Sequence, residues 1–183
     1  MAGSSDLSLW GRFTPEQVEA IAAQLFSECL RHGYTSLCEF HYIQRDPRGA
    51  LYARPAEMAE RVAAAGQGTG IGLTLLPVLY SYSGFGEQAL KPEQARFRTD
   101  AETVLRIVEA LAPLRSGQLE VGAAPHSLRA ATIGQVRELA AQLHARAVQS
   151  LHLLALSGTP ALDATLASAE AQGFRIESLE VPA

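Results

Sequence analysis

Apolar residues in this chain recur at two alternating spacings. From Val18 to Leu30 they return every third or fourth position, which predicts an amphipathic helix. The segment Thr14-Pro-Glu-Gln17 precedes it with the pattern of a capping box and a proline at the first helical position, and Gly33 is expected to end the helix. Residues 34–43 are rich in aromatic and apolar side chains, and this composition predicts a strand.

The same alternation continues to the end of the chain. Further helices are predicted at about 55–65, 99–113, 132–145 and 160–172, and further strands at about 71–80, 119–124, 147–156 and 174–181. The run 71–80 is almost continuously apolar, as expected for a strand covered on both faces. The glycines at 66, 68, 70 and 72 are expected to break the second helix, and Thr99-Asp-Ala-Glu102 to cap the third.

Strands that alternate with helices indicate an α/β fold with a mostly parallel sheet of about five βα units in a single domain, residues 1–183. The length excludes a complete eight-fold β/α barrel, which normally takes about 250 residues. Right-handed crossovers bring the carboxyl ends of all strands to one edge, where ligands bind in open sheets and in barrels. The functional residues are therefore expected directly after the strands.

Charge and hydropathy exclude several classes of function. A net charge of −4 gives no basic face for nucleic acid, and no apolar run approaches the roughly 20 residues needed to span a bilayer. The amino terminus lacks the pattern of a signal peptide, so a cytoplasmic protein is expected. Cys29 and Cys38 match no common zinc or redox spacing, and both are expected to be small, reduced core residues.

Polar side chains follow several of the predicted strands. They are His41 and Tyr42, then Tyr80 with the Gly84-Phe-Gly86 loop, then His126 and Arg129, and finally His152. Arg129 could hold a carboxylate through two hydrogen bonds while His126 bonds a polar substrate group. Equally, Arg129 could be a salt-bridged surface residue and His126 an ordinary loop histidine.

The remaining histidines have structural interpretations. His32 is expected to be a cation at a helix terminus, and His144 a solvated helix residue. His41 is either hydrogen-bonded beside the sheet or functional. The chain has no H-x-H, H-E-x-x-H, C-x-x-C or G-x-S-x-G motif, and its alternating glycines precede a strand instead of following one, so no dinucleotide fingerprint is present.

Several segments together resemble the formimidoylglutamate deiminase family of the amidohydrolase superfamily. They are Glu16-Gln-Val-Glu-Ala-Ile-Ala-Ala-Gln-Leu25, Gly33-Tyr-Thr-Ser-Leu-Cys-Glu-Phe-His-Tyr42, Ile71-Gly-Leu-Thr-Leu-Leu-Pro-Val-Leu-Tyr80, Gly84-Phe-Gly86 and His126-Ser-Leu-Arg129. The similarity covers roughly residues 14–145, with 1–13 an extension and 146–183 diverged. It implies a partial barrel of the amidohydrolase (TIM) type. It also implies a zinc-dependent hydrolase that converts N-formimino-L-glutamate to N-formyl-L-glutamate and ammonia in histidine degradation.

The resemblance also implies roles for individual residues. Tyr80, His126 and Arg129 would contact the substrate, and His152 would correspond to a metal-ligand histidine, although its neighbours differ from the family pattern. The family's H-x-H pair and metal-binding aspartate would lie before residue 1 and beyond residue 183. A catalytic zinc site needs about three protein ligands, so this chain alone is expected to bind no zinc and to be inactive.

Two alternatives to an enzyme stay open. The chain could be a non-catalytic module that binds an acidic amino-acid derivative through Arg129, or a gene remnant without a function. An incomplete barrel would expose the apolar strands 71–80 and 147–156, so either a homodimer that closes the sheet or poor solubility is expected.

Overall fold

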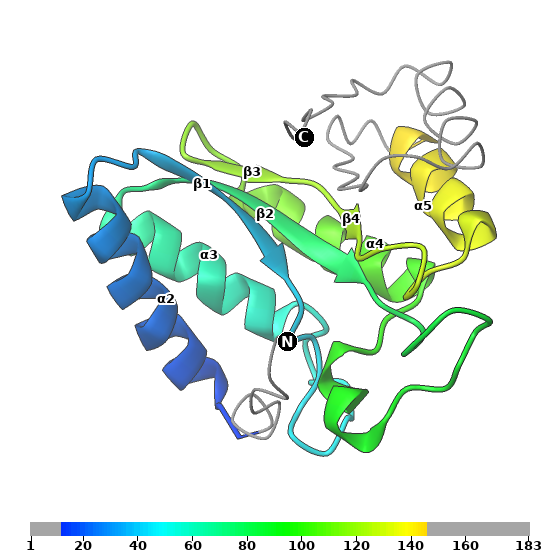
Figure 1. Ribbon diagram of the computed structural model, residues 1–183. Helices are drawn as coiled ribbons and strands as arrows, with labels where there is room; N and C mark the ends of the chain where they lie inside the picture. The colour runs from blue at the N-terminus through cyan, green and yellow to red at the C-terminus, as the bar shows by residue number, and fades with distance from the viewer. Residues whose placement is uncertain (1–11, 146–183) are drawn as a thin grey trace, which may run out of the picture.

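The computed structural model describes residues 12–145, which form a sheet with helices packed against it (Figure 1). In chain order the elements are α2 (Pro15–Arg31), β1 (Ser36–His41), α3 (Glu57–Thr69), β2 (Gly72–Leu79), the 3-10 helix η1 (Pro92–Phe97), α4 (Ala101–Leu111), the 3-10 helix η2 (Ala112–Leu114), β3 (Leu119–Val121), β4 (Ala124–Pro125) and α5 (Ile133–Ala145). None of these helices is long and apolar enough to cross a membrane.

The four strands of the described region form a parallel sheet around β2. Strand β1 pairs with β2 from Ser36 opposite Gly72 to His41 opposite Pro77, and β3 and then β4 pair with the other side of β2. All three ladders are parallel, which confirms the predicted parallel sheet. The expected strands at 147–156 and 174–181, and with them the count of five βα units, lie outside the described residues.

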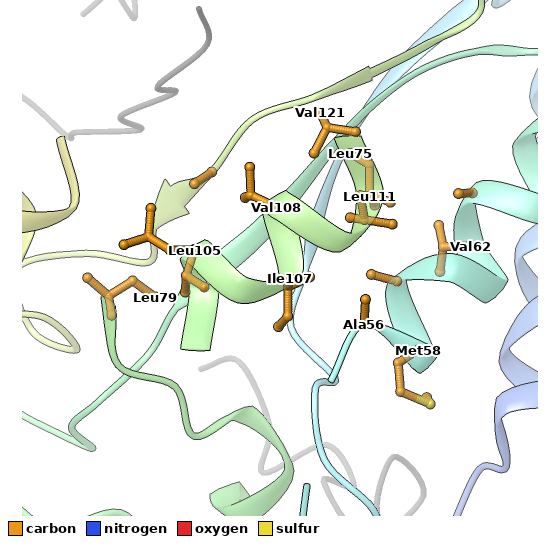
Figure 2. Close-up of a cluster of buried hydrophobic side chains, with 14 of the residues drawn as sticks. Ala56, Met58, Val62, Leu75, Leu79, Leu105, Ile107, Val108, Leu111 and Val121 are labelled. Atoms are coloured by element: carbon orange, nitrogen blue, oxygen red, sulfur yellow. The ribbon is translucent and has the colours of Figure 1, made fainter. Parts of the chain in front are cut away.

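The main core lies between the sheet and the helices (Figure 1). Figure 2 shows part of it, in which Leu75 and Val121 of the strands lie near Val108 and Leu111 of α4. Every residue from Leu75 to Leu79 is buried, so the carboxyl half of β2 is covered on both faces as its apolar run predicts. This buried strand carries the candidate site at its end.

The predicted cap of the first helix forms as expected, and a second helix begins in the same way. The Thr14 hydroxyl accepts a hydrogen bond from the Gln17 amide at 3.3 Å, and the Gln17 side chain accepts one from the Thr14 amide at 3.0 Å. The side chains of Thr132 and Gln135 make the same reciprocal pair at the start of α5. Each pair gives acceptors to backbone N–H groups that the first helical turn leaves without one.

The glycine-rich segment is partly helical, contrary to the sequence prediction. Helix α3 continues through Gly66 and Gly68 to Thr69, and only Gly70, with φ of 80°, ends it in the left-handed conformation. Gly66 is buried against β2, where a Cβ would lie 2.9 Å from Leu73 Cδ2. Gly66 thus allows the close approach of α3 to the sheet and does not break the helix.

The interpretation of Cys38 as a core residue is wrong, whereas Cys29 does pack against the main core. Cys38 is exposed and Cys29 is half-buried. Side chains alternate along β1, where Leu37 packs on the main core and Cys38 lies on the opposite face, which the described helices leave uncovered. The run of apolar and aromatic residues in this segment does not indicate that only one face of β1 is covered.

Two connections, β1 to α3 and β2 to α4, are held together by arginine side chains. The Arg96 guanidinium is buried and its Nε donates to the Arg45 carbonyl at 2.8 Å, while Arg45 Nε donates to the Arg98 carbonyl at 2.7 Å. The Gln44 and Arg45 amides both donate to the Arg96 carbonyl. The two loops therefore form one unit beside the carboxyl ends of the strands.

Candidate functional site

The candidate site lies at the carboxyl ends of β2 and β4. Tyr80 directly follows β2, and His126 directly follows β4. Strand pairing places Leu79 opposite Pro125, and the His126 amide donates to the Leu79 carbonyl at 3.1 Å. Parallel pairing thus brings the two side chains to the same edge of the sheet.

Aromatic rings pack against one another at this edge. The Tyr80 and His126 ring centroids are 4.8 Å apart with the ring planes 80° to each other. Tyr42, which follows β1, contacts the same imidazole at 5.6 Å, and Phe97 packs edge-on against both tyrosines. These edge-to-face contacts hold the Tyr80 ring in one place.

Arg129 completes the group of predicted site residues. Its Cζ atom lies 5.9 Å from the centroid of the Tyr80 ring, and its Nη1 donates to the Ser83 carbonyl. Tyr80, His126 and Arg129 are therefore brought together, although they come from two βα units. Within residues 12–145 the Ser83 bond is the guanidinium's single hydrogen bond, so most of its planar fork of donors stays available for an anion.

His126 is electrically neutral near pH 7. Burial lowers the pKa of its imidazole, and the positive charge of Arg129 lowers the pKa further. Its Nδ1 lies 2.8 Å from the Ser127 hydroxyl, which fixes the orientation of the ring. A neutral imidazole beside a cation leaves the positive charge of the site on Arg129.

The segment from Gln94 to Thr99 holds Tyr80 in place. The Thr99 hydroxyl donates to the Val78 carbonyl at 2.8 Å and accepts from the Tyr80 amide at 2.7 Å. The Thr99 amide donates to the Tyr80 carbonyl, and Gln94 Nε2 donates to the Tyr80 hydroxyl at 2.9 Å. Thr99 thus acts as a strand partner for the end of β2, and the helix cap that the sequence assigned to it is provided by Asp100, whose carboxylate accepts from the Thr103 amide.

Gln94 was missed at the sequence level, although a signal for part of its role exists. Lys91-Pro-Glu-Gln94 repeats the spacing of the first helix cap, and the Gln94 side chain does accept from the Lys91 amide at 3.0 Å. That pattern predicts a cap. It gives no indication that the other end of the amide reaches Tyr80.

Replacing Thr99 with valine, which has the same shape without the hydroxyl, is expected to lower the free energy of unfolding by about 2 kcal/mol. The buried Tyr80 amide loses its acceptor, and the Val78 carbonyl loses a donor. Urea denaturation followed by circular dichroism measures the change.

Thr69 offers a matched control for this substitution. Its hydroxyl donates to Ala65 and Gly66 carbonyls inside α3, so Thr69→Val leaves no backbone donor without a partner and should change stability by less than about 0.5 kcal/mol. Equal losses in the two variants would contradict the role assigned to Thr99.

The other histidines lie apart from this group of rings or outside the described residues. His41 is buried at the end of β1 with its Nε2 unpartnered among the described residues, and burial lowers the pKa of its imidazole to about 4. His32 ends α2, where its Nδ1 donates to the Glu28 carbonyl at 2.8 Å. His144 is exposed on α5, as expected, and His152 lies outside the described residues.

The chain is similar in sequence to a characterised enzyme. No family model matches it. It is 43% identical over 155 residues to formimidoylglutamate deiminase of Pseudomonas aeruginosa. The chain is a homologue of formimidoylglutamate deiminase. The match covers 79% of the chain, which spans about a third (34%) of the length of the Pseudomonas enzyme.

Solved structures agree with this relationship. The homologue of formimidoylglutamate deiminase superposes on an amidohydrolase from Brucella melitensis with a TM-score of 0.73 and 37% sequence identity, over 83% of this chain and 36% of the other. Atrazine chlorohydrolase from Arthrobacter aurescens, solved in complex with zinc, gives a TM-score of 0.61 at 16% identity, over 82% and 32% of the two chains. The open parallel sheet therefore matches part of the fold of amidohydrolase enzymes.

The zinc in that neighbour raises the question of a metal site in the formimidoylglutamate deiminase homologue. Between residues 12 and 145 there is no group of three or more histidine, cysteine, aspartate or glutamate side chains that could hold a metal ion. A catalytic zinc needs about three such ligands, so the described residues do not fit one. The predicted ligand His152 lies beyond them.

Proposed function

We propose that Tyr80, His126 and Arg129 bind a carboxylate-bearing substrate of the N-formimino-L-glutamate type. The main observation is that a guanidinium with a single hydrogen bond among residues 12–145 lies beside a tyrosine and a histidine at the carboxyl edge of a parallel sheet. The identity to formimidoylglutamate deiminase suggests which anion this is, because glutamate derivatives carry carboxylates that match the planar fork of an arginine.

The reaction that the relationship suggests is hydrolysis of the formimino group. Water replaces the imino nitrogen, and the products are N-formyl-L-glutamate and ammonia. We assign no step of this reaction to a metal, because the described residues do not form a metal site. Their role is to hold the glutamate part of the substrate while the formimino group extends from the edge of the sheet.

The geometry also sets the expected affinity. A charge-assisted hydrogen bond contributes about 1.5–3 kcal/mol, and two from Arg129 would give roughly millimolar binding, or about 4 kcal/mol, in a site that water partly reaches. Arg129 is only half-buried, which favours the lower end of that range.

Arg129→Ala is expected to abolish binding of N-formimino-L-glutamate in a calorimetric titration of the purified chain. The variant loses the cation and both hydrogen bonds to the carboxylate. Arg115→Ala is the control, since Arg115 pairs with Glu120 at the opposite edge of the sheet and should leave binding unchanged. Identical titrations of the two variants would contradict the proposed site. Ammonia measured in the same samples separates an enzyme from a module that binds without turnover.

A further inference from the structure

The side-chain amide of Gln94 has a defined orientation. One end lies 3.0 Å from the backbone amide of Lys91, which can only donate, so that end must be the oxygen. The nitrogen end, which can only donate, is then 2.9 Å from the Tyr80 hydroxyl. The Tyr80 oxygen therefore accepts this hydrogen bond, and its own proton has to point elsewhere.

Other contacts leave Tyr80 little freedom besides the direction of that proton. Its backbone is fixed by Thr99, and its ring packs against Phe97 and His126. Within the part of the chain that the structure describes, no acceptor takes the Tyr80 proton. The guanidinium of Arg129 lies over the same ring.

We propose that Gln94 is a positioning residue that makes the Tyr80 hydroxyl a hydrogen-bond donor to the bound ligand. This inference rests on the proposed function, in which Tyr80 contacts the substrate. A hydroxyl that must donate selects an anionic or carbonyl oxygen at this point and disfavours an amine or amide N–H, because such a group would face another donor. Gln94 thus contributes to specificity for a carboxylate without touching it.

The substitution Gln94→Glu reverses the hydrogen bond with almost no change in shape. A carboxylate still accepts from the Lys91 amide, but towards Tyr80 it can only accept, so the tyrosine proton turns away from the ligand and towards the new side chain.

Vibrational spectroscopy reads this reversal without any ligand. The intensity ratio of the tyrosine Fermi doublet in the Raman spectrum is high for a hydroxyl that accepts a hydrogen bond and low for one that donates. Subtracting the spectrum of the matching Tyr80→Phe protein isolates Tyr80. We expect a high ratio in the wild-type chain and a low ratio in Gln94→Glu. Equal ratios would overturn the inference.

Titration with N-formimino-L-glutamate tests the consequence for binding. Gln94→Glu should weaken binding about ten-fold, the loss of one hydrogen bond to a charged group. In a Tyr80→Phe background the same substitution should weaken binding clearly less than ten-fold, because there is no hydroxyl to turn and only the added negative charge acts. A full ten-fold loss in that background would mean that Gln94 does not act through Tyr80, and would overturn the inference.

Gln88→Glu controls for charge, since it adds the same negative charge to an exposed position in the same connection and should leave binding unchanged. The two proposals fail in different ways. A wild-type chain that binds no N-formimino-L-glutamate contradicts the proposed function, whereas the Raman spectra still decide which way the Tyr80 hydroxyl points.

Discussion

Replacing Phe26 with alanine is expected to lower the free energy of unfolding by about 3–5 kcal/mol. Phe26 is 1% exposed and is one of the largest fully buried side chains among residues 12–145. It lies on α2, the helix that packs along α3. Truncation removes the ring from the main core and leaves a cavity that two packed helices cannot close. Urea denaturation of the purified chain measures the loss.

The neighbouring residue is a control for this prediction. Leu25 lies one position earlier on α2 but is 53% exposed, so Leu25→Ala removes few contacts and should change stability by at most about 0.5 kcal/mol. Comparable losses at the two positions would mean that α2 does not pack on the core through Phe26.

Acidification is expected to destabilise the fold through His41, with a loss of about 3 kcal/mol between pH 7 and pH 4. The pKa of His41 is lowered by burial to about 4, against about 6.5 in the unfolded chain. Between these two pKa values the His41 imidazole is therefore protonated in the unfolded state and neutral in the folded state. The contribution of the neutral His41 to stability is complete when the pH is above the pKa of His41 in the unfolded chain. It is lost as the pH falls towards the pKa of His41 in the folded protein.

Denaturant titrations of the wild type and of His41→Gln at several pH values check this expectation. Protonation of carboxylates with a lowered pKa, such as those of Asp46 and Asp100, also destabilises the fold in acid. These carboxylates titrate in the wild type and in the variant alike. The difference between the two proteins therefore isolates His41. Parallel stability curves from pH 7 to pH 5 would show that the His41 imidazole is not buried in its neutral form.

The parallel sheet and the candidate site could be predicted because both depend on local patterns. The continuous apolar run 71–80 requires burial on both faces, and strands of one direction end at one edge, so Tyr80, His126 and Arg129 had to approach one another once each was placed after its strand. These inferences need the order of the elements and the spacing of apolar residues, and no details of packing.

Contacts between distant segments could not be read from the same patterns. Thr99 has the sequence position of a helix cap, yet its hydroxyl bonds the backbone of β2, which lies about 20 residues earlier. Cys38 is exposed because only one face of β1 is covered by the described helices. The residue type alone does not indicate which face of the strand is covered. The sequence around Gln94 indicates its hydrogen bond to the Lys91 amide but not its hydrogen bond to Tyr80.

The arginines that join the two connections have a consequence for how this chain can vary. Each guanidinium binds a backbone carbonyl of the other loop, Arg96 at Arg45 and Arg45 at Arg98. Every residue has a backbone carbonyl, whatever its side chain. No substitution at an acceptor position can therefore compensate for the loss of either arginine. Each loop contributes the donor of one hydrogen bond and the acceptor of the other. An insertion in one loop would displace both groups relative to the other loop and break both bonds. Among natural variants of this segment we therefore expect the lengths of the two loops to be preserved jointly, while the residues at their tips diverge.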